Sequence, residues 1–274
     1  MPISSRVSSS LKKRKRISSF KKTLYIFIFI LFFASLFALS LTSDKLVINN
    51  IFVSGNSSVS ESDISGIAEA WLNEKYLWFI RTDNTFLIKR SEIRVQILDL
   101  IPKIESVKID FHGPVNVEII VTERAPIGIW CQNLPSDPGK CFFLDRTGFV
   151  FGEAPKFGDS IYPKYFGFID STNAIKSGYF DESKFSQIDQ FYGKIKDMKL
   201  SPKYFYAKDE HEYEVGLSDG GKIFANDTQS FEKELSNLQA LIDSGYVKTD
   251  KAFLKKIDYI DLRFGNKVPI VIRK

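Results

Sequence analysis

Histidine is scarce among the residues of this chain that could perform chemistry near neutral pH. The 274 residues include only His112 and His211. An imidazole acts as an acid or base when a nucleophile, a carboxylate or a metal lies beside it. Each histidine lies next to a predicted turn or strand end, and no G-x-S-x-G, H-E-x-x-H or calcium-loop pattern is present. These patterns favour a protein that is not an enzyme and that holds no metal or other cofactor.

One segment approaches a phosphate-binding loop. Residues 216–223 read GLSDGGKI, close to G-x-x-x-x-G-K-[ST], but Ile223 stands where a hydroxyl would hold magnesium. The glycines also fall between two predicted strands, whereas a phosphate-binding loop opens a helix. We therefore predict a β-turn. Asp258 and Asp261 could in principle share acid–base work, but residues at this spacing point to opposite faces of a strand.

The two cysteines, Cys131 and Cys141, are separated by QNLPSDPGK, which is typical of a hairpin loop. A disulfide would require facing strand positions with Cα atoms about 4.4–6.8 Å apart. The alternative is two free thiols. A metal site is disfavoured, because the spacing is not C-x-x-C and neither histidine is near in sequence.

Charge is distributed unevenly along the chain. Residues 1–43 contain eight basic side chains and no acidic one, although the whole chain has a net charge of only +5. Residues 23–41 are uncharged, and a helix of that length spans roughly 28 Å, near the ~30 Å core of a bilayer. The pattern predicts a cytoplasmic basic arm over residues 1–22, a transmembrane helix over residues 23–43 and an exported body. A cleaved signal peptide ending near Ala38-Leu39-Ser40, or a nucleic-acid-binding arm, are the alternatives.

The body reads as two blocks of α+β structure, with the boundary near residue 124. In residues 46–124 the hydrophobic spacing predicts strand, helix, helix, strand, strand, a three-stranded sheet covered by two helices. In residues 125–274 the spacing predicts a mixed, largely antiparallel sheet with helices, including a helical stripe of Phe185, Ile188, Phe191, Ile195 and Met198. Strands over residues 257–264 and 268–272 end the chain. Hydrophobic residues at 44% and charged residues at 26% exclude global disorder.

Several short motifs follow one another along the body of the chain. Val53-Ser54-Gly55-Asn56 fits V-x-G-N. Pro102, Ile104 and Val107 fit P-x-I-x-x-V, and Glu123-Arg124-Ala125-Pro126 followed by Trp130 fits E-R-x-P…W. Asp145, Gly148, Val150 and Phe151 fit D-x-x-G-x-V-F, and residues 259–264 read YIDLRF. In order and spacing these motifs resemble the FtsQ/DivIB family of bacterial cell-division proteins, whose POTRA domain carries the first three and whose second domain carries the last two.

The resemblance implies a non-enzymatic scaffold at the division septum that helps control septal peptidoglycan synthesis. It implies a single-pass protein of the bacterial inner membrane, with a POTRA domain over residues 44–124 and a C-terminal binding domain over residues 125–274. The implied partners are FtsB/DivIC-like and FtsL-like bitopic coiled-coil proteins, with no nucleic acid and no small-molecule substrate. Carried onto this chain, the partner-binding positions are Tyr259, Asp261, Arg263, Phe264, Val268, Ile270 and Ile272.

A C-terminal edge strand suits that role, because its unpaired N–H and C=O groups can receive a partner strand. Alternation predicts that Ile260, Leu262 and Phe264 face the core and that Tyr259, Asp261 and Arg263 meet the partner, unless they are only a solvated face. Pro269 has no N–H and could shorten the docking strand. Two other functions remain open: a POTRA-containing envelope-assembly or secretion factor, and an anchored envelope hydrolase.

Overall fold

The structure is a computed structural model, and contacts within the chain divide it into two compact units. The first unit comprises Met1–Asp99 and Ser106–Thr122, and the second comprises Leu100–Glu105 and Glu123–Lys274. The structure describes residues 21–36, 46–72, 75–76, 80–81, 84–85, 87–156, 161–169, 173–228, 230–265 and 267–273.

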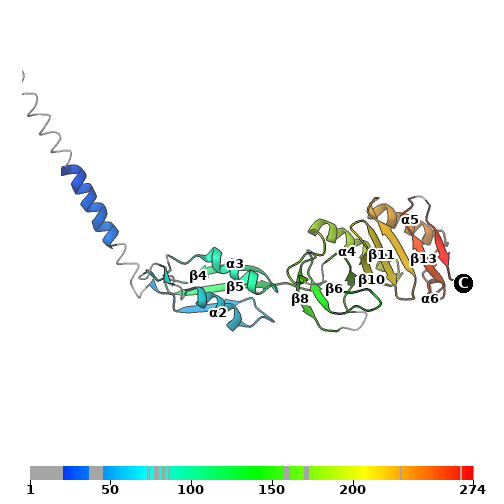
Figure 1. Ribbon diagram of the computed structural model, residues 1–274, viewed down its shortest axis with the longest axis horizontal. Coiled ribbons are helices and arrows are strands. Elements are labelled where there is room, and N and C mark those ends of the chain that lie inside the picture. Colours follow the sequence, from blue (N-terminus) through cyan, green and yellow to red (C-terminus); the bar gives the residue numbers. More distant parts are fainter. Residues whose placement is uncertain are drawn as a thin grey trace, which may run out of the picture. The chain divides into compact units, whose positions relative to one another are not determined.

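A helix covers residues 21–36, drawn dark blue in Figure 1. In the part of the chain that the structure describes, no helix combines the length and the apolar character needed to cross a membrane.

The prediction of a transmembrane helix over residues 23–43, and with it of a single-pass inner-membrane protein, is therefore wrong. The prediction of a cytoplasmic arm over residues 1–22 and of an exported body depended on the membrane span and loses its support with it. Residues 1–20 of the basic arm and residues 37–43 of the predicted span lie outside the described residues. The fold is mixed α/β, with a nine-stranded sheet as its largest part.

The first unit is built on a three-stranded sheet of order β1-β5-β4, in which β1 runs parallel to β5. One parity of β5 is buried, Val117, Ile119 and Val121, as the alternation of a strand with one covered face requires. The helices bury residues at helical spacing, which include Ile64, Ala68 and Trp71 of α2 and Ile93 and Ile97 of α3. The elements are β1 (Asn50–Ser54), α2 (Glu61–Leu72), β2 (Lys75–Tyr76), β3 (Ile80–Arg81), α3 (Arg90–Leu100), β4 (Ile104–Phe111) and β5 (Asn116–Glu123).

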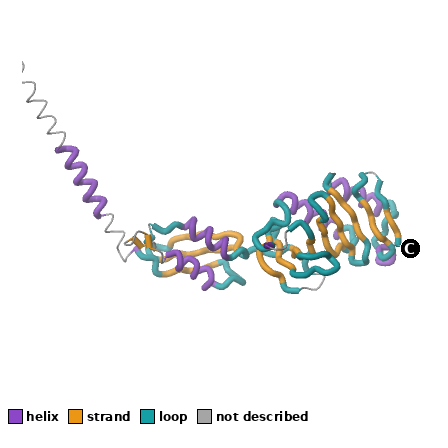
Figure 2. The backbone as a smooth tube through the Cα atoms, viewed as in Figure 1, coloured by secondary structure: helices purple, strands orange, loops and turns teal. Residues whose placement is uncertain are grey.

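The second unit is built on the nine-stranded sheet, whose order is β14-β13-β12-β11-β10-β9-β6-β7-β8. Figure 2 shows these strands side by side in orange. The strand that ends the chain, β14, therefore forms one edge of the sheet, and β8 forms the other. The strands are β6 (Gly128–Cys131), β7 (Cys141–Leu144), β8 (Val150–Ala154), β9 (Lys164–Phe166), β10 (Pro202–Ala207), β11 (Glu212–Leu217), β12 (Lys222–Asn226), β13 (Ile257–Asp261) and β14 (Ile270–Ile272).

Two helices, α4 (Glu182–Asp197) and α5 (Phe231–Asp243), pack against each other and against one face of this sheet. Their stripes join the strand residues in the main core, where Phe185, Ile188 and Leu238 are fully buried. Asp181 and Ser230 cap the two helices by accepting hydrogen bonds from backbone N–H groups of the first turn. A short helix, α6 (Lys251–Leu254), precedes β13.

Two hairpins answer questions that the sequence posed. Cys131 and Cys141 lie opposite each other on β6 and β7 and are joined by a disulfide, so the structure has the bridge and not the free thiols. The glycine-rich segment 216–223 contains the turn between antiparallel β11 and β12. It opens no helix, so its N–H groups are not arranged as in a phosphate-binding loop.

Candidate functional site

The candidate site lies at the β14 edge of the large sheet, where the predicted partner-binding residues are found. β14 runs antiparallel to β13, with Val271 opposite Tyr259 and Ile270 opposite Ile260. Among the residues that the structure describes, no strand pairs with the outer side of β14. Figure 1 shows the strand in red at the C-terminal margin of the sheet.

Hydrogen bonds to β13 show which backbone groups of β14 point outward. Asp261 N donates to Pro269 O at 3.0 Å, and Arg273 N donates to Lys256 O at 2.7 Å. Since the N–H and C=O of one residue point to the same side and sides alternate along a strand, Ile270 and Ile272 direct theirs outward. The N–H that Pro269 lacks would have pointed inward, towards β13. Pro269 therefore leaves the outer hydrogen-bonding groups of Ile270 and Ile272 intact.

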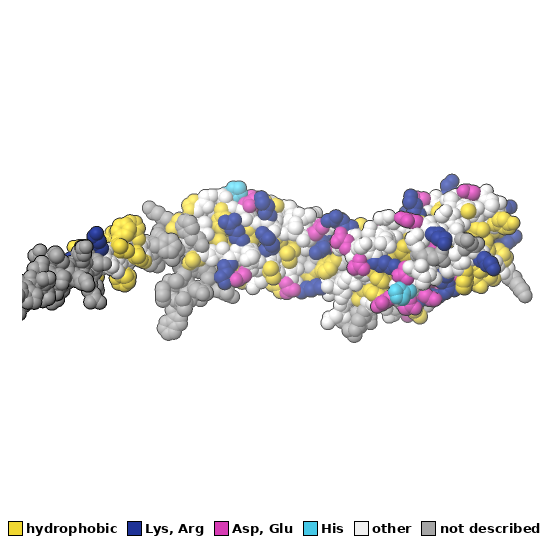
Figure 3. Space-filling view, turned by 90° about the horizontal axis from the view of Figure 1, so that it is seen from above, with side chains coloured by type: hydrophobic (Ala, Val, Ile, Leu, Met, Phe, Trp, Pro, Cys, Tyr) yellow, Lys and Arg dark blue, Asp and Glu magenta, His cyan; other side chains and the backbone are white. Residues whose placement is uncertain are grey.

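The side chains of this edge are apolar and lie on both faces. Val268 and Ile270 pack against the main core, whereas Ile272 is 45% exposed. On the face opposite α4 and α5, the ring of Tyr259 lies 5.4 Å from that of Phe224. Figure 3 shows hydrophobic side chains gathered near the C-terminal end of the second unit.

Asp261 does not face solvent, contrary to the predicted alternation. Its side chain is only 5% exposed, because the Arg263 guanidinium lies across it and donates from Nη2 to Oδ2 at 2.7 Å. Arg263 also donates from Nε to Asp261 Oδ1 at 2.9 Å and contacts Glu212 at 3.3 Å. These bonds to Asp261 raise the pKa of Arg263 above its usual value. Arg263 keeps about a quarter of its side chain exposed, so it remains accessible to a partner.

Phe264 was predicted to face the core, and the structure corrects this. Its side chain is 62% exposed, whereas Ile260 and Leu262 are buried as predicted. The reason is that β13 ends at Asp261 and the chain then turns over residues 263–265, which breaks the two-residue alternation. Phe264 is thus an apolar side chain presented on a turn beside the edge strand.

A network of charges accompanies the aromatic residues on the face opposite α4 and α5. Glu214 is 5% exposed and accepts hydrogen bonds from Lys222 at 2.9 Å and from the Tyr204 hydroxyl at 2.8 Å. Burial acts to raise the pKa of Glu214, but the bonds from Lys222, Tyr204 and Lys208 outweigh it, so the pKa lies below its ordinary value. Lys208 Nζ lies 4.5 Å from the centre of the Phe224 ring. Two lysines thus share the single carboxylate of Glu214 on this face.

The histidines do not form a catalytic arrangement. In the first unit, Glu118 accepts from the Ser54 hydroxyl at 2.8 Å and contacts His112 Nε2 at 2.7 Å. The hydrogen bond with His112, followed by that from Ser54, lowers the pKa of Glu118. The carboxylate lies between the hydroxyl and the imidazole, so the imidazole is not placed to take the serine proton. His211 contacts Asp227 at 2.9 Å on the surface of the second unit.

A cavity of about 800 Å³ lies beside the disulfide in the second unit. Its charged lining includes Lys140, Lys156 and Lys164, and Lys140 Nζ is 3.4 Å from Glu153. The described residues that line it include no Ser, Thr or His, and Cys141 is part of the disulfide. These residues do not bring a nucleophile and a base together. In the described part of the chain, no group of three or more His, Cys, Asp or Glu side chains could hold a metal ion.

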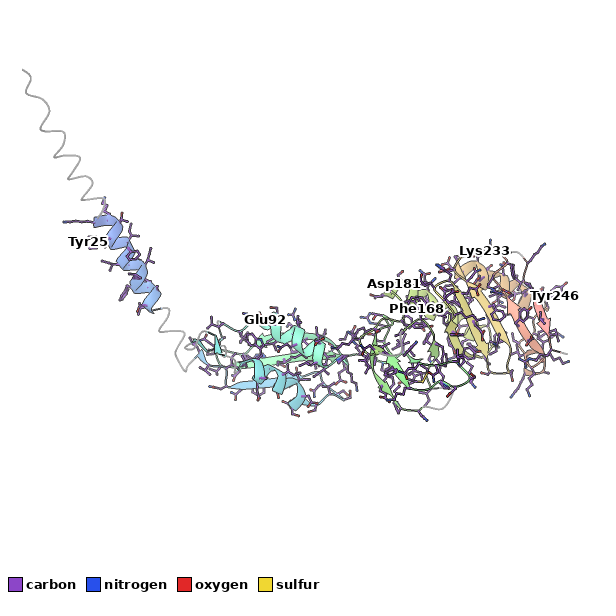
Figure 4. The ribbon with its side chains drawn as sticks, viewed as in Figure 1. Tyr25, Glu92, Phe168, Asp181, Lys233 and Tyr246 are labelled. Atoms are coloured by element: carbon purple, nitrogen blue, oxygen red, sulfur yellow. A yellow bond between two sulfur atoms is a disulfide. The ribbon has the colours of Figure 1, made fainter. Side chains whose placement is uncertain are left out.

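Two aromatic residues near the site were missed by sequence reasoning. Phe224 alternates with the buried Ile223 and Ala225, and its ring packs at a tilt against that of Tyr259, a pairing that depends on the parallel register of β12 and β13. Tyr246 is 74% exposed and follows α5, and Figure 4 shows it at the same end of the unit as β14. The signal for Tyr246 was a large aromatic residue directly after Gly245, a turn residue with φ of 78°.

Comparison with known proteins identifies no family for this chain. No family model matches it, and no curated protein matches it.

Proposed function

We propose that the chain is a non-enzymatic scaffold of the FtsQ/DivIB type that receives a strand from a small coiled-coil division protein at the β14 edge. The partner is an FtsB/DivIC-like or FtsL-like protein, and the process served is control of septal peptidoglycan synthesis. The proposal rests on the sequence motifs and on one structural observation. That observation is a terminal strand whose outer N–H and C=O groups, at Ile270 and Ile272, have no strand beside them among the described residues.

The chemistry of the edge supports strand addition over other modes of binding. Backbone groups at Ile270 and Ile272 would supply two residues of ladder to an incoming strand. The exposed side chains of Phe264 and Ile272 supply apolar area on which a partner side chain can pack. Arg263 supplies a charge that favours an acidic residue on the partner. Together these features describe a short, mainly hydrogen-bonded docking strip with an apolar and a basic contact.

A proline at position 272 tests the docking strand directly. We expect Ile272→Pro to weaken capture of the partner about tenfold, because proline removes one outward N–H and its ring obstructs the incoming strand. The inward bond of the neighbouring Arg273 N–H to Lys256 O is retained in this variant. The measurement is the dissociation constant of the full-length chain for the purified soluble segments of FtsB/DivIC-like and FtsL-like proteins from the same genome.

Ile272→Thr is the matched control, since threonine is also β-branched and keeps the N–H. We expect its affinity to stay within about threefold of the unaltered chain, because a partly exposed side chain is changed and no backbone group is lost. Equal affinity of the Pro and Thr variants would place the docking strand elsewhere. Failure of the folded chain to bind either coiled-coil partner would overturn the proposed function itself.

Substitutions at the turn beside β14 should separate binding from stability. We expect Phe264→Ala to weaken capture while changing the free energy of unfolding by less than about 0.5 kcal/mol, because the ring is mostly exposed. Arg263→Ala should weaken capture and also lower stability by about 1–3 kcal/mol, because it leaves the buried Asp261 carboxylate without its partner. Capture assays paired with denaturant unfolding measure both quantities. Unchanged capture by Phe264→Ala would remove this turn from the interface.

A further inference from the structure

A buried carboxyl group in the first turn of α5 has no part in the proposed docking. Glu234 is in the first turn of α5 and is 0% exposed. Lys233, labelled in Figure 4, marks the exposed side of the same turn. A glutamate is almost never buried to this extent unless it is paired or hydrogen-bonded, so its surroundings decide its charge.

Glu234 holds the end of a strand. Its Oε1 accepts a hydrogen bond of 3.0 Å from the backbone N–H of Asn226, the last residue of β12. Two residues earlier, Phe224 O still accepts from Leu262 N at 2.9 Å, in the ladder that β12 forms with the chain around β13. The Glu234 carboxyl group thus accepts a hydrogen bond from the last amide of β12, just beyond the point where the ladder with β13 ends. Its second oxygen, Oε2, has no hydrogen-bond partner among the residues that the structure describes.

The same helix holds the turn that leads to β14. One turn further along α5, the Asn237 side chain donates from Nδ2 to Gly265 O at 2.7 Å. Gly265 belongs to the turn over residues 263–265. The N-terminal half of α5 therefore fastens both the end of β12 and the β13–β14 turn, and Glu234 is the one of the two contacts that can change its charge.

The charges around Glu234 come from each element packed near it. The pKa of Glu234 is raised to about 7; burial is the largest cause, and the carboxylates of Asp261 and Asp227 act in the same direction. The hydrogen bond from Asn226 and the charge of Arg263 act in the opposite direction.

The neighbouring carboxylates are themselves neutralised. Asp227 is held by Lys184 of α4 at 2.8 Å, by His211 at 2.9 Å and by the Tyr213 hydroxyl at 3.2 Å. Asp261 is held by Arg263, which also contacts Glu212. Each nearby basic group therefore has a carboxylate partner of its own, and Glu234 has no direct countercharge among these contacts.

We propose that Glu234 is a proton-operated latch that fastens the start of α5 to the end of β12 when protonated, and loosens this contact when ionised. A neutral carboxyl can keep Oε1 on the Asn226 N–H without placing a charge in the core. An ionised one leaves Oε2 charged, buried and unpaired, which favours openings of the contact that admit water.

The sign of the pH effect follows from the direction of the pKa change. The closed latch binds its proton up to about pH 7, whereas the carboxyl of an opened latch has the ordinary value of 4.5. Between these values the closed form holds more protons, so opening becomes easier as pH rises. From pH 6 to pH 8 the opening equilibrium should shift about tenfold towards the open form, since the opened carboxyl is ionised throughout and the closed one titrates within that range.

The test is amide hydrogen exchange of the full-length chain at pH 6 and pH 8, with rates corrected for the intrinsic effect of pH. We expect the protection of the Asn226 amide to fall about tenfold in the unaltered chain, with most of the fall below pH 7 and a levelling off above it. In Glu234→Gln, which keeps an acceptor for Asn226 and cannot ionise, this fall should disappear. Amides of β6 and β7, far along the sheet order, should show no such dependence.

Glu232→Gln is the matched control, because Glu232 is an exposed carboxylate in the same helical turn. It should behave as the unaltered chain. Protection at Asn226 that does not change with pH in the unaltered chain would overturn the latch, whether or not the Gln variant folds. The same pH dependence in Glu234→Gln as in the unaltered chain would also overturn it. These readouts need no partner, so the latch stands or falls separately from the proposed function.

Discussion

Replacing Arg124 with Met should lower the free energy of unfolding of the second unit by about 3–5 kcal/mol, because it leaves a buried carboxylate without its countercharge. Arg124 donates from Nη1 to Asp145 Oδ2, and the two side chains are 16% and 4% exposed. The guanidinium also donates from Nε to Pro102 O at 3.1 Å and lies 4.2 Å above the Phe149 ring. Methionine keeps the stem and the ring contact but none of the charge.

The loss should depend on pH in a definite direction. Burial tends to raise the pKa of Asp145, but hydrogen bonds from Thr147, Phe149 and Arg124 outweigh it, so the pKa lies below its ordinary 3.8. A lowered pKa contributes stability that is present above the ordinary value and is lost as pH falls through the folded value. Without Arg124 this contribution shrinks, so the difference between the variant and the unaltered chain should narrow in acid.

Arg146→Met provides the control, since Arg146 is 74% exposed in its pair with Glu105. We expect it to change stability by no more than about 1 kcal/mol. Guanidinium unfolding of the full-length chain, with hydrogen exchange to assign the transition to the second unit, measures both variants. In the double variant Arg124→Met/Asp145→Asn, part of the stability should return, because the stranded charge is gone. A loss in Arg124→Met no larger than that in Arg146→Met would refute the buried-pair account.

Substituting Gly55 with Ala should destabilise the first unit by about 4 kcal/mol, for two additive reasons. Gly55 has φ of +82°, a conformation that carries a penalty of about 1–2 kcal/mol for a residue with a Cβ. A Cβ there would also lie 2.1 Å from the backbone oxygen of Val121, so β5 or the turn after β1 must move. Overpacking of this kind costs about 1–3 kcal/mol.

Two other glycines separate these contributions. Gly113→Ala meets the same backbone penalty, with φ of +79°, but nothing lies within 4 Å of its added Cβ, so we expect only about 1–2 kcal/mol. Gly66→Ala lies within α2 with open space around it and should stabilise the unit by about 0.5–1 kcal/mol. Denaturant unfolding of the three variants provides the comparison. If Gly55→Ala lowers the free energy of unfolding by no more than Gly113→Ala does, the close approach of Gly55 to Val121 does not contribute to the cost of the substitution.

Three of the residues that carry the family resemblance have structural roles in this chain. Gly55 allows the chain to pass close to β5, and Arg124 and Asp145, from two separate motifs, form one buried ion pair. These roles concern stability and not the binding of a partner. The docking proposal rests instead on the β14 edge, where the exposed groups of Phe264 and Ile272 lie.

Periodicity allowed much of the local structure to be predicted. The stripe of Phe185, Ile188, Phe191 and Ile195 lies on α4 and is buried, because helical spacing records which face meets the core. The alternation of Val117, Ile119 and Val121 likewise identified the buried face of β5. Hydrophobic length misled at residues 23–43, where an uncharged run suggested a membrane span that no described helix is long and apolar enough to make.

The sequence by itself determined the helical stripes, the alternating strands and the hairpin turns, because each depends on residues a few positions apart. Only the tertiary structure decided that β14 is an edge strand and that Arg263 covers Asp261. It also decided that Pro269 faces β13 with the side on which it lacks an N–H, so that the outer side of β14 is unaffected. It also placed Glu234 of α5 against the last amide of β12. These outcomes depend on register and on contacts between distant segments, and no local spacing encodes which strand will lie beside another.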